Sequence, residues 1–397
     1  MVLTLAERSK LIAPSATLAM AAEAKRLKVE GVDVLDFALG EPDFPTPINI
    51  QEAAFRAIRD GKTHYTPPAG IPELKAAVAE AFSAATGLPT APAQVVISNG
   101  AKQSLHNALM ALVGPGDEVI IPAPYWVSYA DLVKLAGAEP VIIETTEASG
   151  FKMAPEAFRE AVTPRTKLLM LNSPSNPTGV VYSREELEAI ADAVLATGVG
   201  VISDEIYEEL LYDGAKATVF ASLRPGLAER TVTISGVSKT YAMTGWRIGW
   251  AIAPAGVAKF MGDIQSQETS NPCSVSQWAA LEAITGPKDA VRAMHAQFAL
   301  RRAFVLERVE RLPGVTCVPP GGAFYAFLNV SSHFGRHLGG TRIEDSTSFC
   351  STALAKVHVA LVMGAAFGTE GYARLSFATD LETLGQGFDA LSRFLRD

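Results

Sequence analysis

The sequence of 397 residues predicts an α/β protein with a mostly parallel, seven-stranded sheet sandwiched by helices in a large domain, and a smaller α+β domain beside it. Three observations predict this fold class. Seven short apolar runs lie between residues 94 and 253, and helical patterns separate several of them. Such near-continuous apolar strands are typical of parallel sheets that are covered on both faces. After about residue 290 the pattern changes, which predicts the second domain.

The seven predicted strands follow the apolar runs in chain order. They are QVVIS (94–98), DEVII (117–121), PVII (140–143), KLLML (167–171), GVGVIS (198–203), TVTIS (231–235) and IGWAIA (248–253). After the first run, Leu105, Ala108, Leu109 and Leu112 recur at helical spacing and predict an amphipathic helix. Before the fifth run, Ser183 with Glu186 three residues later predicts a helix that starts with a capping box.

The last hundred residues predict a different architecture. A long helical pattern at 290–312 ends before Pro313-Gly314, and two β-rich runs follow at 322–329 and 372–379. We therefore expect three parts of the chain. Residues 1–48 form an N-terminal arm and part of the small domain, residues 49–290 form the large domain, and residues 291–397 form the C-terminal small domain.

Composition excludes several classes of function. Lys and Arg number 34 against 42 Asp and Glu, a net charge of −8, so the chain has no basic stripe for nucleic acid. The three cysteines lack CxxC spacing and no HExxH occurs, so we predict no metal site and expect reduced thiols in a cytoplasmic protein. No apolar run reaches the length of a membrane span, and the N-terminus lacks the apolar core of a signal peptide. His333 and His337 are expected in an exposed loop.

Polar residues follow several of the predicted strands. In open α/β sheets, ligands collect at the carboxyl ends of the strands. The turn Asn99-Gly100-Ala101-Lys102 leads into a helix, and the amides of such a turn suit an anion such as phosphate. Asn176 lies in the turn SPSNPTG, where two prolines either fix its orientation for a ligand or simply stiffen a loop.

The next two strand ends carry a carboxylate and an amine. Asp204 ends one buried strand, either as the partner of a cationic ring nitrogen or as a helix N-cap, and Tyr207 lies three residues further on. Lys239 follows the next strand. An anion cradle, an acid for a ring nitrogen and a lysine together match the requirements of pyridoxal 5′-phosphate, with Lys239 forming the Schiff base to it.

These motifs carry a resemblance to a known family. Lys239 with Arg247, SPSNPTG (173–179) and SDEIY (203–207) resemble the class I, fold-type I pyridoxal-phosphate aminotransferases. The phrases LGEPDF, YTPPAGIPEL, PAPYWVSY, AMTGWRIGW and RLSFAT resemble the bacterial aspartate aminotransferases of the Ib type. The resemblance runs in order from near residue 14 to near residue 390.

The resemblance implies a role for each matched residue. Lys239 binds the cofactor and moves the proton, Asp204 pairs with the ring nitrogen, and Tyr207 and Asn176 hold the ring hydroxyl. The remaining implied cofactor contacts come from Gly100, Ala101, Lys102, Trp126, Ser238, Arg247 and, from a partner subunit, Tyr65. Ser235 is an alternative to Ser238 for the phosphate. The implied substrate contacts are Gly40, Lys102, Trp126, Asn176 and Arg374.

The implied reaction is a ping-pong transfer of an amino group from L-aspartate to 2-oxoglutarate in a homodimer. Arg374 would bind the substrate's α-carboxylate, and Lys102 would bind the distal carboxylate or instead pair with a surface acid. Relatives that also transaminate prephenate carry a lysine before PSAT; Ala13 stands there in this chain, which weakens that alternative. Aromatic and alanine-type substrates stay open. A serine–lysine hydrolase with Ser238 and a non-catalytic sensor are the alternatives of a different class, and no GxSxG or SxxK motif supports the first.

Overall fold

The computed structural model describes residues 3–11 and 16–396 of the chain. Its α-helices are α1 (Ala16–Val29), α2 (Ile48–Arg59), α3 (Pro72–Thr86), α4 (Ala101–Leu112), α5 (Ser128–Leu135), α6 (Pro155–Ala161), α7 (Arg184–Thr197), α8 (Ala255–Glu268), α9 (Ser274–Thr285), α10 (Asp289–Val309), α11 (Ser346–Val357) and α12 (Leu381–Phe394). Among the described residues, no helix has both the length and the apolar character that a membrane crossing requires.

The large sheet has seven strands in the order β2-β8-β7-β6-β5-β3-β4. The strands are β2 (Val95–Ser98), β3 (Glu118–Ala123), β4 (Glu139–Glu144), β5 (Thr166–Asn172), β6 (Gly200–Asp204), β7 (Thr231–Gly236) and β8 (Gly249–Ile252). Each lies on one of the seven apolar runs, so the predicted sheet is confirmed. β8 is antiparallel to both of its neighbours, β2 and β7, and the other pairs are parallel.

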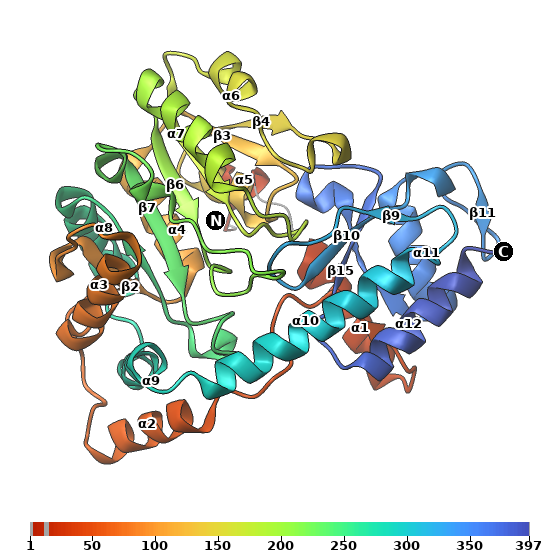
Figure 1. Cartoon of the computed structure of the whole chain (residues 1–397), viewed down its shortest axis with the longest axis horizontal. Helices are drawn as coiled ribbons and strands as arrows, with labels where there is room; N and C mark the ends of the chain where they lie inside the picture. Colours follow the sequence, from red (N-terminus) through yellow and green to blue (C-terminus); the bar gives the residue numbers. More distant parts are fainter. Residues whose placement is uncertain (1–2, 12–15, 397) are drawn as a thin grey trace.

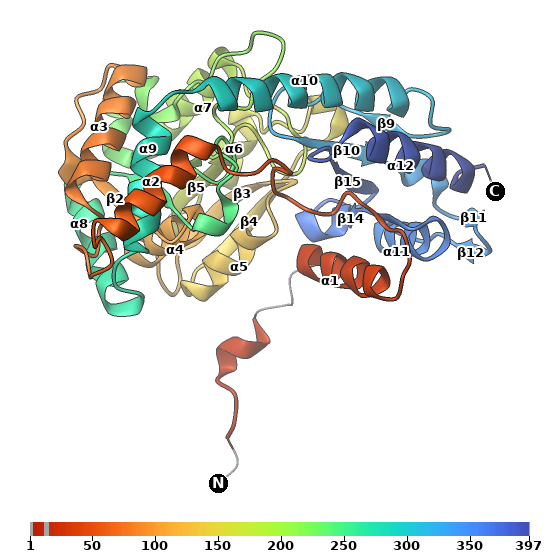
Figure 2. The same cartoon turned by 90° about the horizontal axis from the view of Figure 1, so that it is seen from below.

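Helices cover both faces of this sheet because successive strand residues point to opposite sides. On β7, Val232 and Ile234 pack in one apolar cluster with residues of α4, α5 and α8. The opposite face is covered by α6 and α7 near β5 and by α3 and α9 near β2 and β8. Figures 1 and 2 show the resulting three layers.

A second body lies beside the large sheet. Its four-stranded antiparallel sheet has the order β14-β15-β10-β9. The strands are β9 (Thr316–Cys317), β10 (Tyr325–Asn329), β14 (Val362–Met363) and β15 (Tyr372–Ser376), and the short pairs are β1 (Leu35–Asp36) with β13 (Val359–Ala360) and β11 (His337–Leu338) with β12 (Thr341–Arg342). The long helix α10 runs along both bodies, and residues 3–11 extend away from them (Figure 2).

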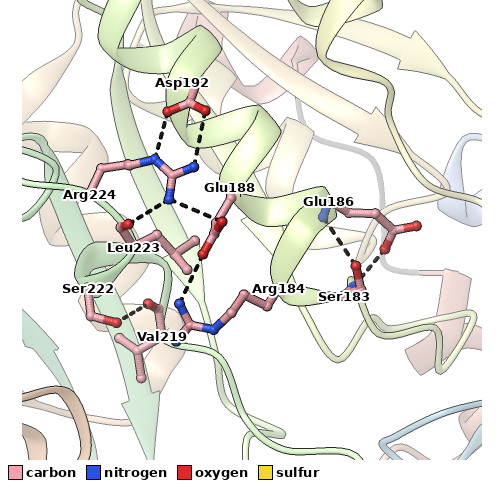
Figure 3. Close-up of polar contacts among 9 residues, drawn as sticks. All are labelled: Ser183, Arg184, Glu186, Glu188, Asp192, Val219, Ser222, Leu223 and Arg224. Carbon is pink, nitrogen blue, oxygen red and sulfur yellow. Dashed lines mark hydrogen bonds and ion pairs between the residues drawn. The ribbon is translucent and has the colours of Figure 1, made fainter.

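Two local contacts hold the start of α7 and the loop after β6 in place. Ser183 and Glu186 form the predicted capping box at the start of α7 (Figure 3). Arg224 donates to both carboxylate oxygens of Asp192 on α7, at 2.8 and 3.2 Å, and also pairs with Glu188. This ion pair ties the loop after β6 to the outer helix layer (Figure 3).

One expectation for the second body was wrong. His333 does not lie in an exposed loop: its side chain is buried, and its ring nitrogens contact the carbonyl oxygen of Pro313 and the guanidinium of Arg336. His337 is exposed, as expected, and begins β11. Gly335, between the two histidines, argues against a helix, but it does not tell whether a neighbouring side chain is buried.

Candidate active site

The strand ends named in the sequence meet at one edge of the large sheet. β2, β7, β6 and β5 all run in the same direction, so Ser98, Gly236, Asp204 and Asn172 end at this edge. Because β8 runs the other way, it begins at the same edge, and Arg247, two residues before its first residue Gly249, lies there too. The single antiparallel strand therefore brings a guanidinium to the ends of the parallel strands.

A cavity of about 320 Å³ opens at this edge, between the large sheet and the second body. Eleven of the thirteen predicted site residues line it: Gly40, Ala101, Lys102, Trp126, Asn176, Asp204, Tyr207, Ser238, Lys239, Arg247 and Arg374. The described lining has four cationic side chains and one carboxylate, that of Asp204. In a protein of net charge −8, this local excess of positive charge favours anionic ligands.

Gly100 and Arg247 form a cradle beside the first turn of α4. Gly100 is the N-cap residue with a φ of 81°, so the first amides of the helix lack intrahelical acceptors. A Cβ on Gly100 would lie 2.4 Å from Nη2 of Arg247, so only glycine allows this approach. Arg247 Nη1 donates to the carbonyl oxygen of Thr244 at 2.9 Å. Free amides next to a guanidinium make a site for a phosphate group.

The two serines considered for this cradle point to different places. Ser238 lines the cavity, whereas Ser235 donates to a carboxylate oxygen of Glu208 on the opposite face of the sheet. Ser238 is therefore the serine that can reach an anion bound at Arg247. Ser238 and Lys239 do not hydrogen-bond each other, which removes the geometric basis for a serine–lysine hydrolase.

Asp204 is held at the end of β6 as a buried carboxylate. It is 4% exposed, its Oδ2 accepts a hydrogen bond of 2.7 Å from the Tyr129 hydroxyl, and its Oδ1 accepts from the Ile206 amide at 3.3 Å. No helix starts at Asp204, so it is not an N-cap. Burial raises the pKa of Asp204 to about 6, although the Tyr129 hydrogen bond acts in the other direction. A cationic partner in the cavity would restore its charge.

Lys239 follows β7 and points into the same cavity. Its Nζ donates to the carbonyl oxygen of Gly40 at 2.6 Å. Burial lowers the pKa of Lys239 to about 8, and the guanidinium groups of Arg374 and Arg247 add to this effect. Because a lysine with a lowered pKa is partly neutral near physiological pH, its amine can act as a nucleophile and as a base.

Arg374 is a fully enclosed cation that makes no ion pair with any carboxylate of the described residues. It lies on β15, is 2% exposed, and donates to the Ala38 carbonyl at 2.6 Å and to Oδ1 of Asn176 at 3.1 Å. Its guanidinium also lies over the rings of Tyr325 and Phe367, at 4.6 and 5.1 Å. Its Nε has no hydrogen-bond partner. Since a buried cation is costly without an anion, this geometry indicates a ligand carboxylate.

Lys102 and Trp126 form the outer wall of the cavity. The Nζ of Lys102 lies 4.8 Å from the centre of the Trp126 ring. Within the described part of the chain it pairs with no surface acid, so that alternative is not supported. Of the two predicted residues outside the lining, Gly100 lies directly beside Arg247, whereas Tyr65 is 92% exposed on the loop before α3.

Two tyrosines of the site were missed in the sequence. Tyr129 holds Asp204, and its position three residues after Trp126, at the start of a helix, could have indicated that it faces the same ligand. The hydroxyl of Tyr325 lies 2.8 Å from that of Tyr207. Tyr325 stands in an apolar run on the second body, where no sequence signal distinguishes it from a core residue.

Comparisons with known proteins identify the family of this chain. A family model for aminotransferases of class I and II matches residues 32–391. The chain is 47% identical over 385 residues to the aspartate/prephenate aminotransferase of Cereibacter sphaeroides, with 96% of each protein covered. It is 46% identical over 391 residues to the aspartate aminotransferase of Geobacillus stearothermophilus, with 98% of each covered.

A solved structure gives the same result for the fold. The structure of Thermus thermophilus aspartate aminotransferase with maleate matches with a TM-score of 0.93 and 42% identity, covering 99% of this chain and 100% of the other. The predicted fold-type I architecture is thereby confirmed. The chain belongs to the family of class I and II aminotransferases.

Proposed function

We propose that this protein is a pyridoxal-phosphate-dependent aminotransferase that moves the amino group of L-aspartate to 2-oxoglutarate. The observation that carries the proposal is Arg374, a cation enclosed at the inner end of the cavity without a carboxylate partner and with a free Nε. A substrate carboxylate satisfies that guanidinium, and a bidentate contact fixes the orientation of the amino acid.

The residues of the cavity fit the cofactor. Gly100, Ala101, Ser238 and Arg247 form an anion cradle for its phosphate group, and Asp204 is the carboxylate for its ring nitrogen. When bound, pyridoxal phosphate supplies an aldehyde that captures an amino group and a ring that accepts electrons from the substrate's α-carbon. Lys239 is the amine that would hold this aldehyde between turnovers.

Each polar side chain then has a definite task. The Nζ of Lys239, with its lowered pKa, would take the proton from the substrate's α-carbon and return it to the carbon on the other side of the amino nitrogen. Asp204, oriented by Tyr129, keeps a negative charge opposite the ring nitrogen. Tyr207 and Asn176 also line the cavity and would hold the ring hydroxyl. Trp126 would lie against the ring and help to exclude water.

The choice of aspartate depends on the second carboxylate. Arg374 lies at the inner end of the cavity and Lys102 at its outer wall, so two cations are available for the two carboxylates of one small substrate. The Thermus relative was solved with maleate, which is also a dicarboxylate. Prephenate is the second candidate because several relatives are named for it, among them that of Nitrosomonas europaea. Ala13, which weakens that candidate, lies outside the described residues.

We also propose a symmetric homodimer in which Tyr65 reaches the cofactor of the partner subunit. Tyr65 is 92% exposed on the loop before α3, so its side chain is free to contact a second copy of the chain. The proposal includes the division of the chain into residues 1–48, 49–290 and 291–397. It also includes a location in the cytoplasm, where Cys273, Cys317 and Cys350 would stay reduced.

Absorption spectroscopy tests the proposal directly. The purified protein is loaded with pyridoxal phosphate, and L-aspartate is added without a 2-oxo acid. We expect the visible band of the bound cofactor to bleach and to return on addition of 2-oxoglutarate. A band that ignores aspartate but bleaches with prephenate's amino product, L-arogenate, or with alanine would reassign the substrate. Failure to bind the cofactor at all would overturn the proposal.

A further inference from the structure

A second cavity, of about 240 Å³, lies on the other face of β7 and β8. Its walls come from α3, from the loop after β6, from the strands and from the end of α9. It shares no lining residue with the active-site cavity, although Thr240 and Tyr241 directly follow Lys239. The ion pair of Arg224 with Asp192 fixes the loop that forms one of these walls (Figure 3).

The charge of this back cavity is negative. Glu208 and Glu209 line it, and none of its described lining residues is a lysine or an arginine. Glu208 Oε1 accepts a hydrogen bond of 2.7 Å from Ser235, and its second oxygen receives none from the described residues. Burial is the main cause that raises the pKa of Glu208 to about 7, and the neighbouring Glu209 adds to it. Glu208 is therefore a half-buried carboxylate that forms no ion pair with a described residue.

Lys288, which contacts the lining residue Tyr241, is engaged by other groups. Lys288 donates to the Tyr241 hydroxyl at 3.0 Å and to the carbonyl oxygens of Ala283 and Ile284 at the end of α9. These contacts hold its ammonium group outside the lining of the cavity. Glu208 thus keeps an oxygen available for a cation that enters from solvent.

An independent observation also points to a ligand. Thr233 lines the cavity and is 3% exposed, yet its hydroxyl has no hydrogen-bond partner. Because an unpaired buried hydroxyl costs free energy, such groups in native proteins normally meet water or a ligand. Thr233 and Ser235 point to the same face of β7, so the unpaired hydroxyl and Glu208 border the same space.

The other lining residues indicate which kind of cation fits the cavity. Phe82 and Trp250 bring aromatic surface to the cavity, and Val78 and Ile252 bring aliphatic surface. A metal ion needs several oxygen ligands around one point, whereas these walls suit a flat apolar body. Carboxylates and aromatic faces together recognise amidinium, guanidinium or alkylammonium groups.

We propose that this back cavity binds a small organic cation with an apolar body, whose charged end is held by Glu208 and Thr233. Benzamidine is a suitable probe because its amidinium can contact a carboxylate through two N–H groups and does not react with an aldehyde cofactor. Benzamide has nearly the same shape without the charge and is the matched control.

Calorimetric titration of the cofactor-loaded full chain tests this site. We expect saturable binding of benzamidine and at least tenfold weaker binding of benzamide. Glu208→Gln keeps the Ser235 hydrogen bond but removes the charge, and it should weaken benzamidine at least tenfold. Thr233→Val keeps the shape of the side chain and should weaken the binding of benzamidine about threefold. It should cost no stability, because the hydroxyl that it removes is unpaired.

Three results would overturn the proposal: no saturable binding of benzamidine, equal binding of benzamide, or wild-type affinity in both variants. A crystal soaked with benzamidine that shows the probe only at the active site would also overturn it. Should Glu208→Gln fail to fold, Thr233→Val and the benzamide control still decide the outcome.

Discussion

The two cavities on either side of β7 have opposite characters. The active-site cavity has four cationic side chains and one carboxylate, whereas the back cavity has two carboxylates and no described cation in its lining. Both contain a buried polar atom without a partner, Nε of Arg374 in one and the hydroxyl of Thr233 in the other. A protein of this charge can therefore present sites for both signs of ligand a few residues apart in the chain.

The difference follows from how one strand is used. In β7, Val232 and Ile234 pack against α4 and α8, while Thr233 and Ser235 face the back cavity. Polar residues on a buried strand face are costly unless they are paired. The active-site cavity instead uses residues after the strand end, where Lys239 can turn away from the sheet. The first site depends on a loop and the second on a strand face.

Lys239→Ala should show the largest difference between the two cavities in their effect on catalysis. We expect kcat to fall by about 10⁴-fold, because the variant lacks the amine that moves the proton. Glu208→Gln is the matched change in the back cavity and should alter kcat by less than about threefold. Steady-state kinetics with aspartate and 2-oxoglutarate measure both. Comparable losses in the two variants would mean that the cavities do not act separately.

Arg374→Ala is the next largest expected effect. It should lower kcat/KM by about 10²- to 10³-fold for every amino acid, since removing one partner of a buried charge pair costs about 2–5 kcal/mol. Arg374→Lys keeps the charge without the two-pronged geometry. Its kcat/KM should lie between the values of Arg374→Ala and the wild type. A loss restricted to aspartate would instead assign Arg374 to the distal carboxylate.

Lys102→Met tests the outer wall of the active site. Methionine keeps an apolar stem against Trp126 but removes the ammonium group that now lies 4.8 Å from the ring. We expect kcat/KM for aspartate to fall by about tenfold or more, which corresponds to about 1.4 kcal/mol, and the value for alanine to change little. Equal losses for the two amino acids would remove Lys102 from substrate recognition.

Tyr129→Phe tests how Asp204 is held. The hydroxyl of Tyr129 lowers the pKa of this carboxylate, so the variant should raise it by about one unit. Because Asp204 must be charged to pair with a ring nitrogen, activity should fall by about fivefold at pH 6 and by much less at pH 8.5. The pH profile of kcat/KM measures the shift. A uniform loss at every pH would indicate a packing defect alone.

The sequence predicted most of the large sheet and of the active site. The seven apolar runs became the seven strands, and strand ends that share an edge placed Asp204 and Lys239 together. This succeeded because parallel strands are apolar throughout and their polar ends are conspicuous. Whether Tyr65 acts across subunits stays a prediction, since it concerns a second copy of the chain.

The parts that the sequence did not predict depend on tertiary packing. Tyr325 comes from the second body and reaches Tyr207 only after the two bodies meet. The back cavity lies between α3, β7 and the loop after β6, and no local pattern reports a gap between helices. Thr233 and Ser235 in TVTIS were the available signal, because hydroxyls alternated with apolar residues in a strand expected to be buried on both faces.

The last prediction concerns stability rather than catalysis and separates two adjacent acids. Asp204 faces the active site, whereas Glu205 points to the other side, where Ser203 and the Phe220 amide donate to its Oε1 at 2.7 and 3.1 Å. Burial raises the pKa of Glu205 to about 8, and the nearby Glu208 adds to this. A raised pKa in the folded state means that protonated Glu205 favours folding, and stability is lost as pH rises from about 4.5 to about 8.

Glu205→Gln should remove this loss because glutamine stays neutral and its Oε1 can accept the same two hydrogen bonds. Between pH 5.5 and 8.5, we expect the free energy of unfolding of the wild type to fall by about 1–3 kcal/mol more than that of the variant. Glu208 still titrates in the variant, so some pH dependence persists. Urea unfolding at both pH values measures the difference, with exposed Glu229→Gln as the control. Parallel pH profiles for wild type and variant would show that Glu205 is charged throughout this pH range.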